Sequence, residues 1–367
     1  MVPQRNKDDY LNSHHMKWEN ELTRQLRITY PIIQAPMLGI TTPEMVAAAS
    51  NTGGLGSLPI GGLSPAKTTE LILQTKALTN KPFAVNLFVH DLPSLYDNEA
   101  YEAMQNYLEQ YATQHGTTFT RQALQDIRFY HYLEQIEILI EHQIPIVSFT
   151  FGILNDDSIK KLKEAGIILI GTATSLEEAQ LLEQKEIDYI AVQGIEAGGH
   201  RGSFIKGALP MIGLMPLLKQ LKSVIQTPLI AAGAIADGES VKTALTQDAI
   251  AVQIGTLFIP AKESTAAPIY KESIQHAKDT DTELTQSFSG RWARGVKNTF
   301  MEDMIKSGLK IPAYPVQNTL TSSLRVYGQQ QNNKNLISLW AGQASSKAKV
   351  GTTTEILLNL IKDTEKQ

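Results

Sequence analysis

The residues with the clearest chemical potential lie at positions 193–202, which read QGIEAGGHRG. They follow an apolar run, residues 189–192, that is typical of a buried strand. Gly198 and Gly199 have no Cβ, so the backbone there can approach a bound group closely. Histidine titrates nearest to neutral pH and can accept a proton or stabilise an anion. We therefore predict that His200 is the catalytic residue of a pocket, with a core histidine bonded to backbone as the alternative.

The elements that must position this segment follow a regular rhythm. Eight short apolar runs alternate with helix-like segments, which is typical of parallel βα units. The runs are continuously apolar, as expected of strands that are covered on both faces. They predict an α/β fold, a TIM (β/α)8 barrel whose active site lies at the carboxyl ends of the strands. The predicted strands are residues 32–38, 55–60, 83–89, 146–152, 168–173, 189–194, 229–234 and 249–256.

Two stretches interrupt the rhythm. The segment after the third run is longer than one returning helix requires and shows two helical patterns, 98–114 and 120–143. About a hundred residues also follow the last run, where a plain barrel needs one helix. The expected division is an N-terminal extension such as a tag (1–15), the barrel (16–260) with an inserted cap (about 90–145), a smaller C-terminal lobe on the substrate side (261–350), and a closing helix with a tail (351–367).

Composition excludes several classes of function. The formal net charge of -4 argues against a protein that binds the nucleic-acid backbone. The chain has no cysteine, which excludes disulfides, thiolate metal sites and a cysteine nucleophile. No apolar run is long enough to span a bilayer, and no signal peptide opens the chain. We expect a cytoplasmic protein, a monomer or homodimer, with no metal, nucleic-acid or membrane partner.

Small residues end the last two predicted strands, at Ala232-Gly233 and at Gly255-Thr256. Backbone N–H groups at such glycines can point at a phosphate, and the threonine hydroxyl adds a donor. Barrel enzymes often bind phosphate in the loops after strands seven and eight. The pattern favours a phosphate site, with glycines that only turn the chain as the alternative.

Neutral amides stand at other predicted strand ends. Asn86, Gln193 and Gln253 each lie within or directly after an apolar run. A buried amide without a partner costs about 1 to 3 kcal/mol, so each needs a hydrogen bond. Backbone satisfies most single cases, but several amides at one mouth indicate a planar, hydrogen-bonding ligand such as a flavin.

The chain contains, in order, the segments IIQAPMLGITTPEM, NTGGLG, VNLFV, SFTFG, QGIEAGGHRGSF, PLIAAGAIADG, VQIGTLF, SGRWARGVKNTF, YPVQNTLTSSLR and LWAGQ. Through these segments, residues 16–344 resemble the class I FMN-dependent nitronate monooxygenases, formerly called 2-nitropropane dioxygenases. The resemblance implies FMN as cofactor and oxidation of alkyl nitronates, with propionate 3-nitronate as a candidate, by O2 to a carbonyl compound and nitrite, a detoxifying reaction.

The same resemblance implies roles for individual residues. His200 matches the active-site histidine, and Ala234 stands where the family usually has a glycine. The flavin ring and phosphate are expected at the strand ends. Trp340 and Gln343, with Tyr314 and Gln317, could form a further wall, with aromatic residues that belong only to the core as the alternative. The predicted cofactor-binding residues are Ala35, Pro36, Met37, Asn86, Gln193, Gly198, Gly199, Ala232, Gly233, Gln253, Gly255, Thr256, Trp340 and Gln343.

Several alternatives stay open from the sequence. The nearest is an NAD(P)H-dependent FMN reductase of quinones or enoyl thioesters on the same scaffold. A flavin carrier without turnover and a barrel for another phosphorylated metabolite are two more. His90 competes with His200 for the pocket, and Arg201 and Glu196 could each make only a surface ion pair. The candidates for binding a substrate carboxylate are Arg291, Arg294 and Lys297.

Overall fold

The computed structural model describes residues 17–92 and 97–367, so the predicted N-terminal extension lies outside the described residues. An eight-stranded parallel sheet has the order β1-β9-β8-β6-β5-β4-β3-β2, and a bridge between Ile33 and Leu55 joins its first and last strands. The predicted TIM barrel is confirmed, and each strand lies within a predicted run. The strands are β1 (Ile32–Gln34), β2 (Ser57–Pro59), β3 (Ala84–Phe88), β4 (Ile146–Thr150), β5 (Ile168–Ala173), β6 (Tyr189–Gln193), β8 (Leu229–Ala232) and β9 (Ala251–Ile254).

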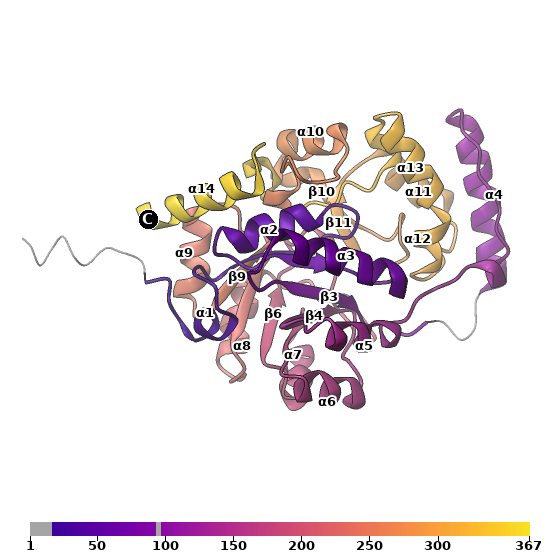
Figure 1. The fold of residues 1–367 in the computed structure, drawn as a ribbon. Coiled ribbons are helices and arrows are strands. Elements are labelled where there is room, and N and C mark those ends of the chain that lie inside the picture. Colours follow the sequence, from indigo (N-terminus) through magenta and orange to yellow (C-terminus); the bar gives the residue numbers. More distant parts are fainter. Residues whose placement is uncertain (1–16, 93–96) are drawn as a thin grey trace, which may run out of the picture.

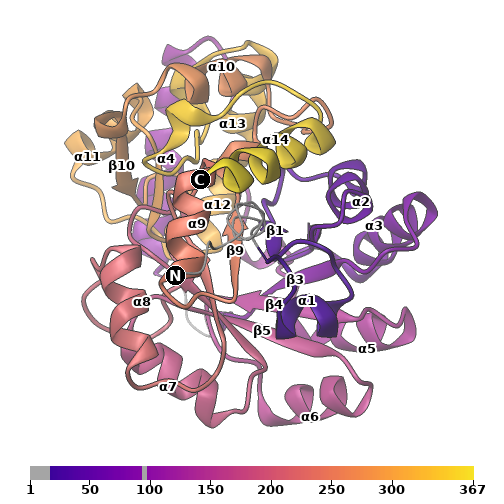
Figure 2. The same ribbon diagram turned by 90° about the vertical axis from the view of Figure 1, so that its left-hand side faces the viewer.

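Helices surround the strands, as the end-on view in Figure 2 shows. Local sequence starts many of them: the Thr42 side chain caps α2, and Pro43 occupies its first turn. The last helix, α14, packs against α9 and α2 and so completes the ring. These helices are α2 (Pro43–Asn51), α3 (Pro65–Leu78), α5 (Leu133–Glu141), α6 (Asp156–Glu164), α7 (Leu176–Gln184), α8 (Leu214–Lys222), α9 (Gly238–Thr246) and α14 (Thr353–Lys366).

The amino end of the barrel is closed by α1 (Glu21–Leu26). Leu22 and Leu26 are buried in one cluster with strand residues such as Ile146 and Ile170. The Asn20 amide, at the helix cap, donates to the carbonyl of Ile250 at 2.7 Å, directly before β9. Packing therefore fills this end, and the carboxyl ends of the strands are left to form a site.

A second hydrophobic cluster lies beside the barrel. Helix α4 (Asn98–Gln114) contributes Tyr101, Met104 and Leu108, which are buried in one cluster with Phe300 and Leu324. Figure 1 shows α4 alongside α11 to α13. The remaining elements are α10 (Pro268–His276), β10 (Thr282–Thr285), β11 (Ala293–Val296), α11 (Thr299–Ser307), α12 (Val316–Leu320) and α13 (Ser322–Gln330), with short 3-10 turns at Leu124–Asp126, Thr256–Phe258, Asp279–Asp281, Lys334–Leu336 and Ser345–Lys347.

We keep the division into barrel, cap, lobe and closing helix as a proposal. The packing of α4 against residues beyond 261 supports a cap joined to the lobe. Helix α5, although within residues 90–145, packs on α3 and α6 as a barrel helix. The inserted part is therefore best placed before α5.

The predicted helix over residues 120–143 is wrong in its first half. Residues 117–132 contain only one 3-10 turn, and the α-helix begins at Leu133. Side chains of α4 hold this backbone instead: the side-chain Oε1 of Gln105 accepts from the Gln122 N–H at 3.0 Å, and the Tyr101 hydroxyl donates to the Gln122 backbone carbonyl at 2.8 Å. These tertiary contacts replace the hydrogen bonds of a helix.

Three short strands that the sequence did not predict connect the barrel mouth to the lobe. Strand β7 (Gly199–His200) pairs antiparallel with β11, which pairs with β10. His200 stands opposite Ala293, more than ninety residues later. The predicted catalytic histidine is thus held by both regions. Among the described residues, no helix is long and apolar enough to cross a membrane.

Candidate active site

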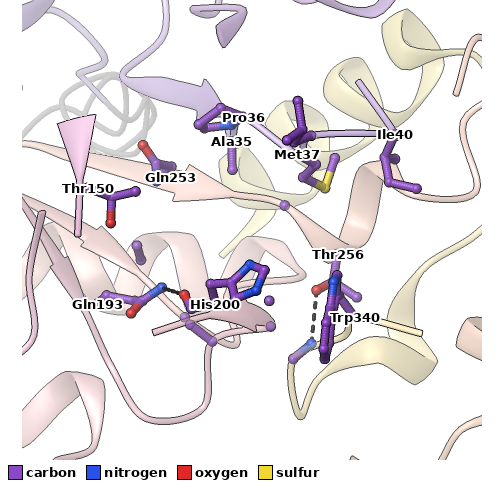
Figure 3. A pocket seen from close by; sticks show the side chains of 18 of the residues that line it. Ala35, Pro36, Met37, Ile40, Thr150, Gln193, His200, Gln253, Thr256 and Trp340 are labelled. Atoms are coloured by element: carbon purple, nitrogen blue, oxygen red, sulfur yellow. Dashed lines mark hydrogen bonds between the residues drawn. The ribbon is translucent and has the colours of Figure 1, made fainter. Parts of the chain in front are cut away.

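A cavity of about 370 Å³ opens at the carboxyl ends of the barrel strands, below the lobe. This volume lies in the range typical of small-molecule and cofactor sites. Its lining includes His200 and every predicted cofactor-binding residue except Gln343, whose backbone N–H donates to the carbonyl of Glu196. Figure 3 shows side chains from the strand ends and from the lobe directed toward this space. The roles of these residues as cofactor contacts stay a prediction.

The wall formed by the first and last strands is tightly packed. A Cβ at Gly255 would lie 3.4 Å from the Cβ of Ala35 and 3.5 Å from the sulfur of Met37. The Met37 N–H donates to the Thr41 hydroxyl at 3.2 Å, which fixes the turn after β1. Glycine therefore keeps this wall open beside the thioether.

The turn after β8 exposes backbone donors to the cavity. Gly233 has φ 134° and Ala234 has φ 50°, so both lie in the left-handed region. Their N–H groups have no acceptor among the described residues. Successive free N–H groups in such a turn form an anion-binding concavity.

The hydroxyl of Thr256 faces the same end of the cavity. It accepts a hydrogen bond from the Gly342 N–H at 3.0 Å, so its own proton is free to donate to a ligand (Figure 3). The free donors of Gly233, Ala234 and Thr256 together suit a phosphate.

The three predicted amides have different partners. Asn86 donates to the Ser148 hydroxyl at 2.9 Å. Gln193 bridges its own loop: its amide donates to the His200 carbonyl at 3.0 Å, and its oxygen accepts from the Gly202 N–H at 2.9 Å. The Gln253 side chain has no partner among the described residues and lines the cavity. Gln193 thus positions the histidine loop, and Gln253 is free to bind a ligand.

Gly198 lets the lobe approach the barrel loop. A Cβ there would lie 2.5 Å from the carbonyl carbon of Ala341 and would overlap the Gly342 nitrogen. No neighbour restricts Gly199, but its φ of 75° is one that other residues rarely adopt. The two glycines therefore have separate structural reasons, contact and conformation.

Ser289 fixes the ring of His200. The Ser289 hydroxyl donates to the Arg291 carbonyl at 3.1 Å, so its oxygen can accept from Nε2 of His200 at 2.8 Å. This arrangement assigns the ring proton to Nε2 and leaves the lone pair on Nδ1. His200 is therefore oriented as a neutral base.

The electrostatics of the site agree with this assignment. Burial, followed by the charges of Arg291 and Arg325, lowers the pKa of His200 to about 3. The imidazole is then neutral at physiological pH. It can accept a proton, whereas a protonated histidine is disfavoured here as the partner of an anion.

Aromatic rings surround His200 from both regions. Its ring centroid lies 5.4 Å from Trp340, 5.7 Å from Phe151 and 5.9 Å from Tyr314. Burial raises the pKa of Tyr314 to about 12, so the phenol keeps its proton. Tyr314 and Trp340 line the cavity, as predicted for a wall, but Gln317 is buried away from it and donates to the Ser287 carbonyl.

The sequence candidates for a carboxylate partner are engaged elsewhere or exposed. Arg291 donates to the carbonyls of Arg201 and Ser203 and lies 4.1 Å from the ring centre of Phe151. Arg294 donates to the Ile195 carbonyl at 2.9 Å, and Lys297 is exposed. The structure does not place any of the three in the cavity lining.

Arg325 is the basic residue that sequence reasoning missed. It lines the cavity from α13. A partial signal was present: Arg325 ends the family-like motif YPVQNTLTSSLR, which also contains the cavity residues Tyr314 and Asn318.

Other candidates turn out to be structural. Both ring nitrogens of His90 are buried without a partner, and the ring packs against Tyr314 at 4.9 Å outside the cavity lining. The prediction that Arg201 makes only a surface ion pair is wrong, because Arg201 is fully buried and donates to the backbone carbonyls of Gln193 and Gly194. Glu196 accepts from the Leu214 N–H at the start of α8. No group of side chains suited to a metal ion occurs among the described residues.

The barrel, its cavity and the neutral histidine define a TIM-barrel protein with a candidate active site at the carboxyl ends of its strands. Residues 19–363 match the protein family described as nitronate monooxygenase. A probable nitronate monooxygenase of Staphylococcus aureus (strain JH9) is 41% identical over 345 residues, which cover 94% of this chain and 96% of that protein. The chain belongs to the nitronate monooxygenase family.

Solved structures agree with this assignment. Nitroalkane oxidase from Streptomyces ansochromogenes has a TM-score of 0.86 and 31% identity, covering 95% of this chain and 98% of that one. FabK from Thermotoga maritima shares the fold less closely, with a TM-score of 0.73 and 25% identity over 95% of this chain and 97% of that one. The family and the fold are thus supported by both sequence and structure.

Proposed function

We propose that this protein uses FMN and O2 to oxidise alkyl nitronates to a carbonyl compound and nitrite. The observation that carries the proposal is the charge of the cavity: no described residue that lines it is acidic, and Arg325 is its one charged lining side chain. An alkyl nitronate is an anion, and a desolvated site without carboxylates favours its entry. Propionate 3-nitronate is our candidate substrate through the family resemblance.

The residues present fit FMN. The free donors after β8 and the Thr256 hydroxyl would hold the phosphate, and the Gln253 amide would bind an edge of the flavin ring. Met37 and the backbone of Gly255, which carries no side chain, provide an apolar surface for a flat ring. When bound, the flavin supplies the transfer of electrons between substrate and O2.

The chain itself supplies proton control. Nδ1 of His200 can take the α-proton of a neutral nitroalkane, which converts it to the nitronate that is oxidised. Ser289 keeps Nε2 occupied, and Gln193 holds the backbone of the same residue. A preformed nitronate needs no such base.

Anaerobic mixing of the FMN-loaded protein with ethyl nitronate, and separately with NADH, tests the proposal while the flavin absorbance is followed. We expect nitronate alone to change the flavin spectrum, and nitrite to appear once air is admitted. A spectrum that only NADH changes would support the reductase instead. A spectrum that neither reagent changes would support a flavin carrier without turnover. A protein that binds no FMN would contradict each of the flavin-dependent functions.

A further inference from the structure

Arg325 has an unusual position for an arginine. It projects from α13 into the cavity wall, on the lobe side that faces His200. Burial lowers its pKa to about 10, so the guanidinium stays charged at neutral pH. A charged group in such surroundings is costly unless it has partners of opposite charge.

The protein provides only part of those partners. One terminal nitrogen, Nη2, donates to the backbone and side-chain oxygens of Asn318, at 2.6 and 3.0 Å. Nε is buried without an acceptor, and no carboxylate of a described residue pairs with the guanidinium. The charge of Arg325 is therefore not neutralised within the described residues.

Other arginines of the same region show what a structural role looks like. The guanidinium of Arg294 donates to the Ile195 carbonyl and to the hydroxyl of Thr282. Arg291 has two backbone acceptors and an aromatic face. Arg325 differs from these two because it lines the cavity and its Nε is buried without an acceptor.

Two neighbours add donors to the same wall. The oxygen of the Asn318 side chain is taken by Arg325, so its NH2 group is free to donate. The Tyr314 hydroxyl has no partner among the described residues, and both side chains line the cavity. Arg325 also acts at the reacting histidine, since its charge helps to keep His200 neutral.

We propose that Arg325, with Asn318 and Tyr314, forms an oxyanion-binding subsite that holds a planar two-oxygen group of the substrate, either its nitronate or a carboxylate on its tail. The inference rests on the proposed nitronate oxidation in the same cavity. A guanidinium fork matches such planar anions with paired hydrogen bonds. The phosphate of a cofactor is a poorer candidate, because the free N–H groups after β8 already offer it a site.

The test compares two nitronates of equal carbon chain, propyl 1-nitronate and propionate 3-nitronate, on FMN-loaded protein. The variants are Arg325→Met, which removes the charge, and Arg325→Gln, which keeps an amide donor for Asn318. Lys297→Met, an exposed position in the same lobe, is the matched control. We expect both Arg325 variants to lower kcat/KM about 10- to 100-fold, mainly through KM, and the control to change nothing.

Comparison of the two substrates shows which anionic group Arg325 binds. A loss on both nitronates assigns Arg325 to the nitronate group, and a loss confined to propionate 3-nitronate assigns it to the tail carboxylate. Unchanged kcat/KM on both substrates, in a variant with wild-type circular dichroism and FMN content, would overturn the subsite.

A binding measurement separates the subsite from the proposed reaction. Calorimetry with propionate, which cannot be oxidised in this way, should show weaker binding to Arg325→Gln than to the wild type by a similar factor. A wild-type protein that oxidises neither nitronate would contradict the proposed function. The propionate affinities would then still decide whether Arg325 binds an oxyanion, and equal affinities would refute it.

Discussion

The two walls of the cavity are built from different chemistry. The barrel wall offers backbone N–H groups at Gly233 and Ala234 and neutral groups such as Gln253. The lobe wall carries the ionisable side chains Tyr314 and Arg325. The barrel wall therefore suits a cofactor with fixed shape, and the lobe wall suits selection of a charged substrate.

His200 stands where the two walls meet. Its backbone is bound by Gln193 of the barrel, and its ring by Ser289 of the lobe. Strand β7 pairs with β11 across the same junction. On the proposed function, this junction aligns the proton acceptor between cofactor and substrate, so changes there should have the largest effects.

Replacement of His200, which both walls hold, tests this comparison most directly. In His200→Asn we expect kcat/KM for neutral nitroethane to fall about 10²- to 10⁴-fold, because the base is lost. Oxidation of preformed ethyl nitronate should fall by less than tenfold, since that substrate needs no proton acceptor. Steady-state nitrite release with each substrate measures the difference. An equal loss on both would mean that His200 serves electron transfer or positioning rather than proton transfer.

A substitution that pushes the barrel wall and the lobe wall apart should have the next largest effect, on stability and on FMN content. The added methyl of Gly198→Ala would overlap the backbone of Ala341 and Gly342, and we expect a loss of about 1 to 3 kcal/mol in the free energy of unfolding, with reduced FMN content. Urea unfolding and flavin absorbance measure both.

Gly166→Ala is the matched control for this change. Gly166 has a positive φ of 74°, unlike Gly198, with open space around its Cβ position and a place remote from the cavity. Gly166→Ala should lower the free energy of unfolding by about 1 to 2 kcal/mol, through backbone strain alone, and leave the FMN content unchanged. Equal FMN loss in both variants would show that the contact at Gly198 does not join the walls.

The same contrast explains what the sequence could predict. Barrel residues such as Met37, Gly233 and Gly255 directly follow apolar runs, so local pattern and barrel topology were enough to bring them together. Arg325 and Ser289 reach the site only through the tertiary packing of the lobe, which no local period encodes. The prediction of a helix over residues 120–143 was wrong in its first half for the same reason, because contacts with α4 override the helical pattern of this segment.

Acid should lower the free energy of unfolding, because two buried histidines have depressed pKa values in the folded protein. Burial lowers the pKa of His90 to about 4 and that of His200 to about 3, from an ordinary value of 6.5. Between these values the unfolded chain binds more protons than the folded one, so stability falls as pH drops from about 6.5 toward 4.

Thermal unfolding at pH 7 and pH 5 measures this effect. The melting temperature of His90→Phe should fall less between pH 7 and pH 5 than that of the wild type, because phenylalanine does not titrate. Its ring should fit among the rings of Phe151 and Tyr314. An equal loss in variant and wild type would mean that His90 keeps an ordinary pKa in the folded protein.

The smallest effect is expected on the barrel wall, at the one residue that departs from the family pattern. Ala234 adopts φ 50°, where a Cβ costs roughly 1 to 2 kcal/mol, whereas glycine loses about 0.5 to 1 kcal/mol more in backbone entropy on folding. Ala234→Gly should therefore raise the free energy of unfolding by no more than about 1.5 kcal/mol, measured by urea titration.

The free N–H groups of this turn keep their directions in Ala234→Gly, so the affinity for FMN should change less than threefold by fluorescence titration, with kcat/KM for nitronate unaltered. A large change in affinity without a change in substrate preference would show that the methyl group itself shapes the phosphate site. A change in substrate preference would contradict the separation of the two walls, because nothing at Ala234 would then be confined to the cofactor side.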